Sequence, residues 1–227
     1  MSARVADLQV VAKALLGAPS RTVTEQCVGQ VLKSAVEIDA VLAEWAESSI
    51  PVGWEWLPAF SFNCPTETPR TLFVHQDRVD IYYDLWVAGL WNNYRITRIM
   101  VQSIVLDCLS RATWADSPQL MQQSRSAIRI SQQMVDEICG SVPFHLGTKI
   151  GLGLGDDAGV EYPVQATSAI TNNQWQASAA LGGWQLIEPL RIALKITCLP
   201  EDQRQWLTQQ LIRIGNILSV DLLSQTK

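Results

Sequence analysis

The stretch from Asp77 to Arg111 contains no proline, and it constrains the fold of this chain more than any other feature. Its apolar residues return every three or four positions, which is the period of one face of a helix. The repeating positions are Tyr83, Trp86 or Val87, Leu90, Tyr94, Thr97, Met100 or Val101, Ile104 and Cys108. Because apolar side chains cover much of its surface, we expect this long helix to lie centrally among others.

Four further segments are expected to be helical. Residues 24–47 show the same period and stop before Pro51, while Ser117 and Pro118 suit the N-cap and first turn of the next helix. A later helix includes Pro189, which is expected to kink or divide it. The last one starts near Pro200, where two acidic residues follow and suit the positive end of the helix dipole.

No segment shows the alternating pattern of a strand, so the sequence predicts an all-α fold: an antiparallel, bundle-like domain of five to six main helices. Residues 1–23 are expected to be a weakly structured segment, with a short helix up to Gly17 as the alternative. Residues 24–227 are expected to form one domain, with loops at about 50–72 and 140–168.

The composition narrows the class of protein. The chain has 227 residues and a formal net charge of -5, and this acidic balance argues against a surface that binds nucleic acid directly. Its five cysteines form no CxxC pair and are odd in number, which favours free thiols in a reducing compartment. No signal peptide or membrane-spanning stretch is evident. We therefore expect an intracellular protein of the nucleus or cytoplasm with no membrane contact.

The segment DEICGSVPFHLG, residues 136–147, offers candidate chemistry. Cys139 and His145 could be a nucleophile with its base, or two metal ligands. The spacing instead predicts a helix that ends at Cys139, with Gly140 after it and Pro143 imposing an extended exit. A helix C-terminus disfavours a thiolate, and two ligands do not make a zinc site. The sequence thus predicts a core thiol and no metal, and leaves His145 open.

Two other features are weaker candidates for chemistry. His75 and Asp77 could form an acid–base pair, although a surface histidine near a helix start is the simpler interpretation. The glycines and acids from Gly151 to Glu161 do not match a phosphate-binding loop, so we expect a flexible loop there. No cofactor is expected.

Nine tryptophans remain to be explained. Aromatic side chains at helical spacing fill a core by default, and the alternative is that some of them line an apolar ligand pocket. The candidate pocket residues are Trp86, Trp91, Tyr94, Trp175 and Trp184.

The order of these motifs resembles the C-terminal half of the fungal-specific regulatory region of zinc-cluster (Zn₂Cys₆) transcription factors. There the long helix often carries an LW-x₄-WN-x-YR pattern, followed by an I-C-x-S-V-P-x-H-L-G stretch and a later tryptophan–leucine–proline helix. The matching residues are Leu85, Trp86, Trp91, Asn92, Tyr94, Arg95, Ile138, Cys139, Ser141, Val142, Pro143, His145, Leu146, Gly147, Leu186 and Pro189. The resemblance covers about residues 30–220.

The resemblance implies a regulatory domain, and regulators of this family commonly control secondary-metabolite gene clusters. The family's DNA-binding module needs six cysteines in a short basic segment, which these five scattered cysteines do not supply. We therefore expect a module that does not bind DNA itself but binds a hydrophobic small molecule or a DNA-binding partner protein, and a homodimer is compatible with this. Two alternatives stay open: a cofactor-independent cyclase or isomerase acting on an apolar natural-product intermediate, and a zinc cluster encoded upstream. Whether the chain is an enzyme is not decided at this stage.

Overall fold

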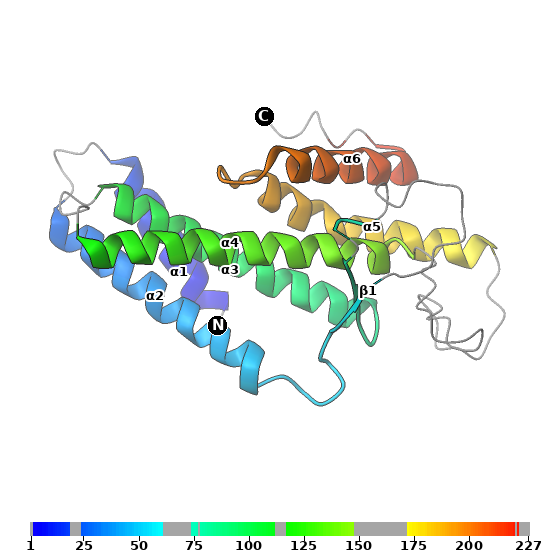
Figure 1. Cartoon of the computed structure of the whole chain (residues 1–227), viewed down its shortest axis with the longest axis horizontal. Coiled ribbons are helices and arrows are strands. Elements are labelled where there is room, and N and C mark those ends of the chain that lie inside the picture. The colour runs from blue at the N-terminus through cyan, green and yellow to red at the C-terminus, as the bar shows by residue number, and fades with distance from the viewer. Residues whose placement is uncertain are drawn as a thin grey trace. The chain divides into compact units, whose positions relative to one another are not determined.

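The computed structural model describes residues 2–18, 24–60, 74–76, 78–111, 117–147, 172–220 and 222, apart from the side chains of residues 2, 57–60 and 172–178. Helices account for most of these residues, which confirms the all-α prediction (Figure 1). The helices are α1 (Ser2–Gly17), α2 (Glu25–Ser48), α3 (Leu85–Arg111), α4 (Pro118–His145), α5 (Asn172–Leu194) and α6 (Glu201–Leu218). Two short strands, β1 (Leu57–Phe60) and β2 (Arg78–Ile81), lie between α2 and α3 in sequence.

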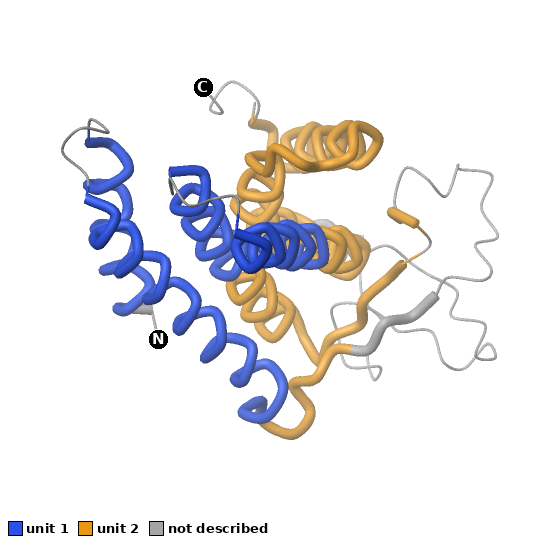
Figure 2. Tube along the Cα trace, turned by 60° about the vertical axis from the view of Figure 1, so that its left-hand side comes forward, with its two compact units in different colours: residues 1–50, 96–134 blue, residues 51–95, 135–227 orange. Residues whose placement is uncertain are grey.

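The chain divides into two compact units, and two of the three boundaries between them fall within helices (Figure 2). Unit 1 comprises residues 1–50 and 96–134, and unit 2 comprises residues 51–95 and 135–227. Each unit thus contains part of α3 and part of α4. That residues 24–227 form a single domain therefore stays a prediction.

In unit 1, α1 packs against α2 through apolar faces on both helices. Thr24 caps α2, and its side-chain oxygen accepts a hydrogen bond from the Cys27 N–H at 3.3 Å. The Arg98 guanidinium forms a two-point ion pair with Asp39, at 2.8 and 3.0 Å. The segment expected to be weakly structured thus contains α1, the alternative helix that ends at Gly17.

In unit 2, α5 and α6 lie side by side (Figure 1). Their contact is apolar, and α5 runs through Pro189 without division. Gly182 is required by a close approach: a Cβ added there would lie 1.9 Å from the His145 carbonyl oxygen at the end of α4. The buried side chains of the helix pair are Leu186, Leu190, Ala193, Leu207, Leu211 and Ile214.

The strand pair was not expected from the sequence, and β1 corrects the prediction of an irregular loop over residues 50–72. The strands run antiparallel, from Leu57 opposite Ile81 to Phe60 opposite Arg78. Each has only four residues, too few for a clear alternation. Moreover, the fully buried position Asp80 is charged, and it is buried by ion pairing and not by apolar character. A pattern of apolar residues cannot detect such a strand.

The predicted end of α4 at Cys139 is wrong, because the helix continues through Gly140 and Pro143 to His145. A Cβ at Gly140 would lie 2.9 Å from Asp80 Oδ2, so this glycine permits close packing of α4 on β2 and does not stop the helix. Pro143 lies in the last turn and has no N–H to donate to the Cys139 carbonyl, so the helix gives up one internal hydrogen bond there. The left-handed residue that ends the helix is Gly147, with φ of 62°. The predicted loop from 140 therefore begins later.

Candidate functional site

The most concentrated group of polar side chains in unit 2 surrounds Arg95, which is fully buried. Arg95 Nε donates to Glu137 at 3.2 Å, and Nη1 donates to the Tyr82 hydroxyl at 2.7 Å and to Asn92 Oδ1 at 2.9 Å. Its Nη2 lies 3.7 Å from Asp80 Oδ2. These partners come from β2, the segment after it, α3 and α4, so one guanidinium joins several elements. We call this group, with Arg78 and Ser141, the Arg95 cluster.

Hydrogen bonds extend the Arg95 cluster on two sides. The Arg78 guanidinium donates to both carboxylate oxygens of Asp80, at 2.9 and 3.2 Å. Asn92 Nδ2 donates to the Ser141 hydroxyl at 2.9 Å, and that hydroxyl donates to the Ile138 carbonyl at 2.8 Å. Two guanidiniums therefore balance two carboxylates, which is the condition for burying charge.

Aromatic rings cover the Arg95 guanidinium. Its central carbon lies 5.3 Å from the Trp56 ring, 5.6 Å from the Tyr82 ring and 5.8 Å from the Trp91 ring. Trp56 also contacts the Arg78 guanidinium, at 4.9 Å. Cation–π contacts of this kind stabilise a cation that water no longer reaches. The aromatic rings hold the arginine in place, and its Nε and Nη1 donate to other side chains of the protein and not to solvent.

The environment of the Arg95 cluster shifts the pKa of its members. Burial raises the pKa of Asp80, and the hydrogen bond from Arg78 and the charge of Arg95 oppose that rise. Burial alone would lower the pKa of Arg95, but Tyr82, Glu137 and Asp80 outweigh it, and the net pKa is raised. Burial also raises the pKa of the Tyr82 hydroxyl, which stays protonated. The Arg95 cluster is thus a set of fixed, paired groups that stabilises the fold.

The candidate dyad of Cys139 and His145 does not form a paired site. Both lie on α4, six residues apart, so they point to different faces about 9 Å apart along the helix axis. Cys139 is buried, and burial raises the pKa of its thiol although a hydrogen bond from Gln203, at 3.7 Å, opposes this. The expected core thiol is what the structure shows.

His145 is fully buried and neutral. Its Nδ1 lies 3.0 Å from the Ser141 carbonyl oxygen, which makes Nδ1 the protonated nitrogen. Burial lowers the pKa of His145 to about 4, the hydrogen bond to Ser141 opposes this, and the charge of Arg95 adds to it. Its Nε2 has no hydrogen-bond partner among the described residues. The ring therefore fills the core beside the Arg95 cluster.

His75 is buried against Trp206, with ring centroids 5.3 Å apart, so the surface position expected for it is wrong. Burial lowers the pKa of His75, and the charges of Asp136 and Asp202 oppose this. The other member of the predicted acid–base pair, Asp77, lies outside the described residues. The glycine-rich stretch 151–161 lies outside them as well.

The predicted aromatic pocket residues occupy different environments. Trp91 and Tyr94 are buried with ring centroids 5.5 Å apart, and the Trp91 Nε1 donates to the Trp54 carbonyl at 2.8 Å. Trp86 and Trp184 are 59% and 66% exposed, respectively. Trp175 lies in α5, but its side chain is not described. A pocket shared by these five residues stays a prediction.

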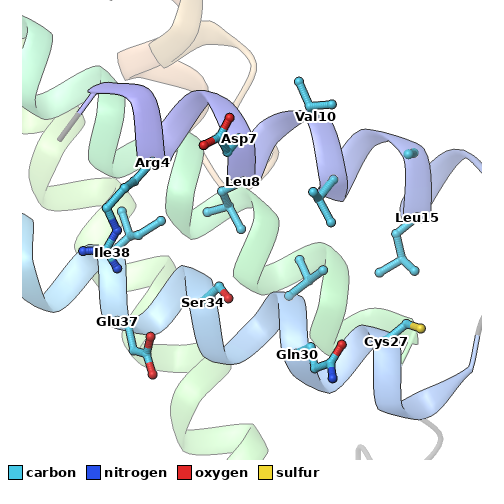
Figure 3. Close-up of a pocket in the computed structure, with 13 residues that line it drawn as sticks. Arg4, Asp7, Leu8, Val10, Leu15, Cys27, Gln30, Ser34, Glu37 and Ile38 are labelled. Atoms are coloured by element: carbon cyan, nitrogen blue, oxygen red, sulfur yellow. The ribbon is translucent and has the colours of Figure 1, made fainter.

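A groove of about 750 Å³ lies between α1 and α2 in unit 1, and we call it the α1–α2 groove (Figure 3). From α1 it is lined by Arg4, Asp7, Leu8, Val10, Val11, Ala14 and Leu15. From α2 it is lined by Cys27, Gln30, Val31, Ser34, Glu37 and Ile38. Its volume lies within the range typical of small-molecule sites, about 300–1,000 Å³.

Sequence reasoning missed this groove because half of its wall belongs to residues 1–23, which looked weakly structured. The available signal was the run Val10 and Val11 in α1, whose side chains are 70% and 53% exposed. Contiguous apolar patches are typical of surfaces that bind a ligand or partner, and both valines belong to the lining of the groove. The period of α1 as a whole does not distinguish them from core residues.

Two features of the described residues limit the possible chemistry further. No group of three or more histidine, cysteine, aspartate or glutamate side chains in this part of the chain is placed to hold a metal ion. None of the helices described above combines the length and the apolarity needed to cross a bilayer.

Comparison with known proteins gives one informative similarity. Over 143 residues the chain is 26% identical to Transcription factor dbaG of Emericella nidulans. The match covers 63% of this chain and 30% of that protein, so the chain spans about a third of the length of the relative it matches. No family model and no solved structure matches the chain.

Proposed function

We infer that this chain has a role in transcriptional regulation, because it is similar to a fungal transcription factor. We propose that it is a helical regulatory module of the fungal zinc-cluster type, which acts in a secondary-metabolite gene cluster. It does so without contacting DNA itself, through a bound apolar small molecule or a DNA-binding partner protein, in the nucleus or the cytoplasm. The observation that carries this proposal is the 143-residue similarity to a transcription factor.

The residues that carry the family resemblance form part of the structural framework and not a reaction centre. Asn92 and Arg95 come from the first motif, and Ser141 and His145 come from the second. In the structure they meet in and beside the Arg95 cluster, where their polar atoms are buried. Motif residues buried in this way favour a structural role and a function located elsewhere on the molecule.

The alternative of a biosynthetic cyclase or isomerase gains no support from the candidate residues. Cys139 and His145 are buried on different faces of α4, and His75 packs against Trp206. Burial lowers the pKa of both histidines and raises the pKa of the Cys139 thiol, so none of these groups offers an accessible acid or base. The regulatory role is therefore the better supported of the two.

Deleting the gene in the source organism tests the proposal. Regulation predicts that transcripts of neighbouring biosynthetic genes fall, as measured by RNA sequencing, and that all products of the pathway fall together. Re-introducing the gene restores both and serves as the control.

Unchanged transcripts together with accumulation of one biosynthetic precursor, detected by mass spectrometry, would instead show a catalytic step and contradict the regulatory role. Unchanged transcripts and unchanged metabolites would contradict both candidate functions.

A further inference from the structure

The α1–α2 groove is long, because it runs along both of the helices that line it. Its lining runs from Arg4 to Leu15 on α1 and from Cys27 to Ile38 on α2, so each wall spans about 16 Å at 1.5 Å per residue. Figure 3 shows Arg4 at the end where Ile38 and Glu37 lie, and Leu15 at the end where Cys27 lies. An occupant that uses the whole groove is therefore elongated.

The two walls of the groove differ in polarity. The α1 wall beyond Asp7 is apolar, with Leu8, Val11 and Leu15 as its larger side chains. The α2 wall presents a polar stripe of Gln30, Ser34 and Glu37 beside Cys27, Val31 and Ile38. An occupant that fits both walls is apolar along one edge and carries hydrogen-bonding groups along the other.

The charges at the rim of the groove cancel. Arg4 and Asp7 stand three residues apart on α1, and Glu37 on α2 has Lys33 4.0 Å away. Among the described residues neither Arg4 nor Asp7 makes an ion pair or a side-chain hydrogen bond, so both can reach an occupant. A neutral molecule with hydroxyl or carbonyl groups matches this balance better than an anion or a cation does.

We propose that the α1–α2 groove binds a neutral, elongated apolar molecule of drug-like size that carries hydroxyl or carbonyl groups along one edge. This assignment rests on the proposed regulatory function, because it identifies the site and the chemical class of the molecule that the module senses. The apolar edge lies along α1, and the polar edge faces Gln30 and Ser34 of α2.

A helix of a partner protein fits the groove less well. The apolar face of such a helix would cover Gln30, Ser34 and Glu37 and would leave their polar atoms without water or a partner. A small molecule with polar groups on one edge satisfies the same atoms. The two occupants thus differ in whether they offer hydrogen-bond partners to the polar atoms of the α2 wall.

The test uses the full chain and Nile red, a neutral, elongated dye whose fluorescence rises in apolar surroundings. We expect saturable binding, and we expect Ala14→Phe to weaken it by about tenfold, because the added ring fills the groove. Ala6→Phe is the matched control: Ala6 is exposed on the same helix and does not line the groove. The control is expected to bind Nile red as the wild type does.

Circular dichroism and melting temperature, recorded for both variants, keep a loss of binding separate from a loss of folding. Absence of saturable Nile red binding by the wild type, or equal binding by Ala14→Phe and Ala6→Phe when both are folded, overturns the assignment. So does tighter binding of the anionic dye anilinonaphthalene sulfonate at the same site, because the rim would then favour charge. None of these outcomes touches the transcript measurement, so the regulatory function can stand or fall independently.

Discussion

The charged side chains of the Arg95 cluster are largely buried and paired, whereas those of the α1–α2 groove are exposed to solvent. In the Arg95 cluster, Arg95 and Asp80 are fully buried, and their charges are matched inside the protein. At the groove, Arg4 and Asp7 are exposed beside apolar side chains. Charges of the first kind are used to hold the fold together, whereas charges of the second kind remain available to an occupant. The residues of the recognisable motifs thus support the fold, and the proposed binding site lies in unit 1.

The largest effect is expected from removing the buried cation. Arg95→Met leaves Glu137 and Asp80 buried without their partner, which should lower the free energy of unfolding by about 3–5 kcal/mol. Urea denaturation followed by circular dichroism measures it. The matched control is Arg98→Met on the same helix, whose ion pair with Asp39 is closer to solvent and should cost about 1 kcal/mol. Equal losses for the two variants would contradict the special role of the Arg95 cluster.

The next effect depends on pH. Burial depresses the pKa of His145 to about 4 from an unfolded value of 6.5, so the unfolded state binds the proton first as the pH falls. Stability from this group is therefore complete above pH 6.5 and is lost between pH 6.5 and 4, by about 3 kcal/mol.

Chemical denaturation at several pH values checks this in the wild type and in His145→Gln. The difference between the two curves isolates His145 from His75, whose pKa is also lowered by burial and which acts in the same direction. A difference that does not change between pH 7 and 4 would show that His145 becomes protonated in the folded protein without cost.

A smaller effect is expected where α5 approaches α4. The added methyl group of Gly182→Ala would collide with the His145 carbonyl oxygen, which should cost about 1–3 kcal/mol. Gly29→Ala is the control, because nothing lies within 4 Å of its added Cβ, and in a helix it should stabilise by about 0.5–1 kcal/mol. Thermal melting gives both values. A Gly182→Ala protein as stable as the wild type would mean that α5 does not pack so closely on α4.

The smallest effect on stability is expected at the groove. Ala14 is exposed, so Ala14→Phe should change the free energy of unfolding by less than about 0.5 kcal/mol. Denaturation in urea, without any added ligand, measures this change. A large loss would place Ala14 in the folding core and remove the contrast between the groove and the Arg95 cluster.

The sequence predicted the helices well because their signals are local. The apolar period of residues 24–47, the start at Pro118 and the long run without proline each mark a helix by short-range chemistry. The predicted face of the long helix was less accurate: Tyr83 is exposed, and the buried set includes Arg95. Of the two alternatives Trp86 and Val87, Val87 is the buried one. An apolar period cannot predict an arginine that is buried by partners distant in sequence.

The same limit explains the errors around Gly140 and in the candidate site. A glycine followed three residues later by proline normally ends a helix, and only the close approach of Asp80 reveals its other role here. The α1–α2 groove was equally hidden, because it depends on which sides of two helices face each other. Long-range contacts decide both features, and a single sequence does not display them.

Transcript levels in two strains of the source organism, one carrying Ala14→Phe and the other Ala6→Phe, test the central claim most directly. If the module regulates through the α1–α2 groove, RNA sequencing should show the transcript changes of the gene deletion in the Ala14→Phe strain. The Ala6→Phe strain should match the wild type, with equal amounts of protein in both strains. Wild-type transcripts in an Ala14→Phe strain whose protein no longer binds Nile red would contradict the account.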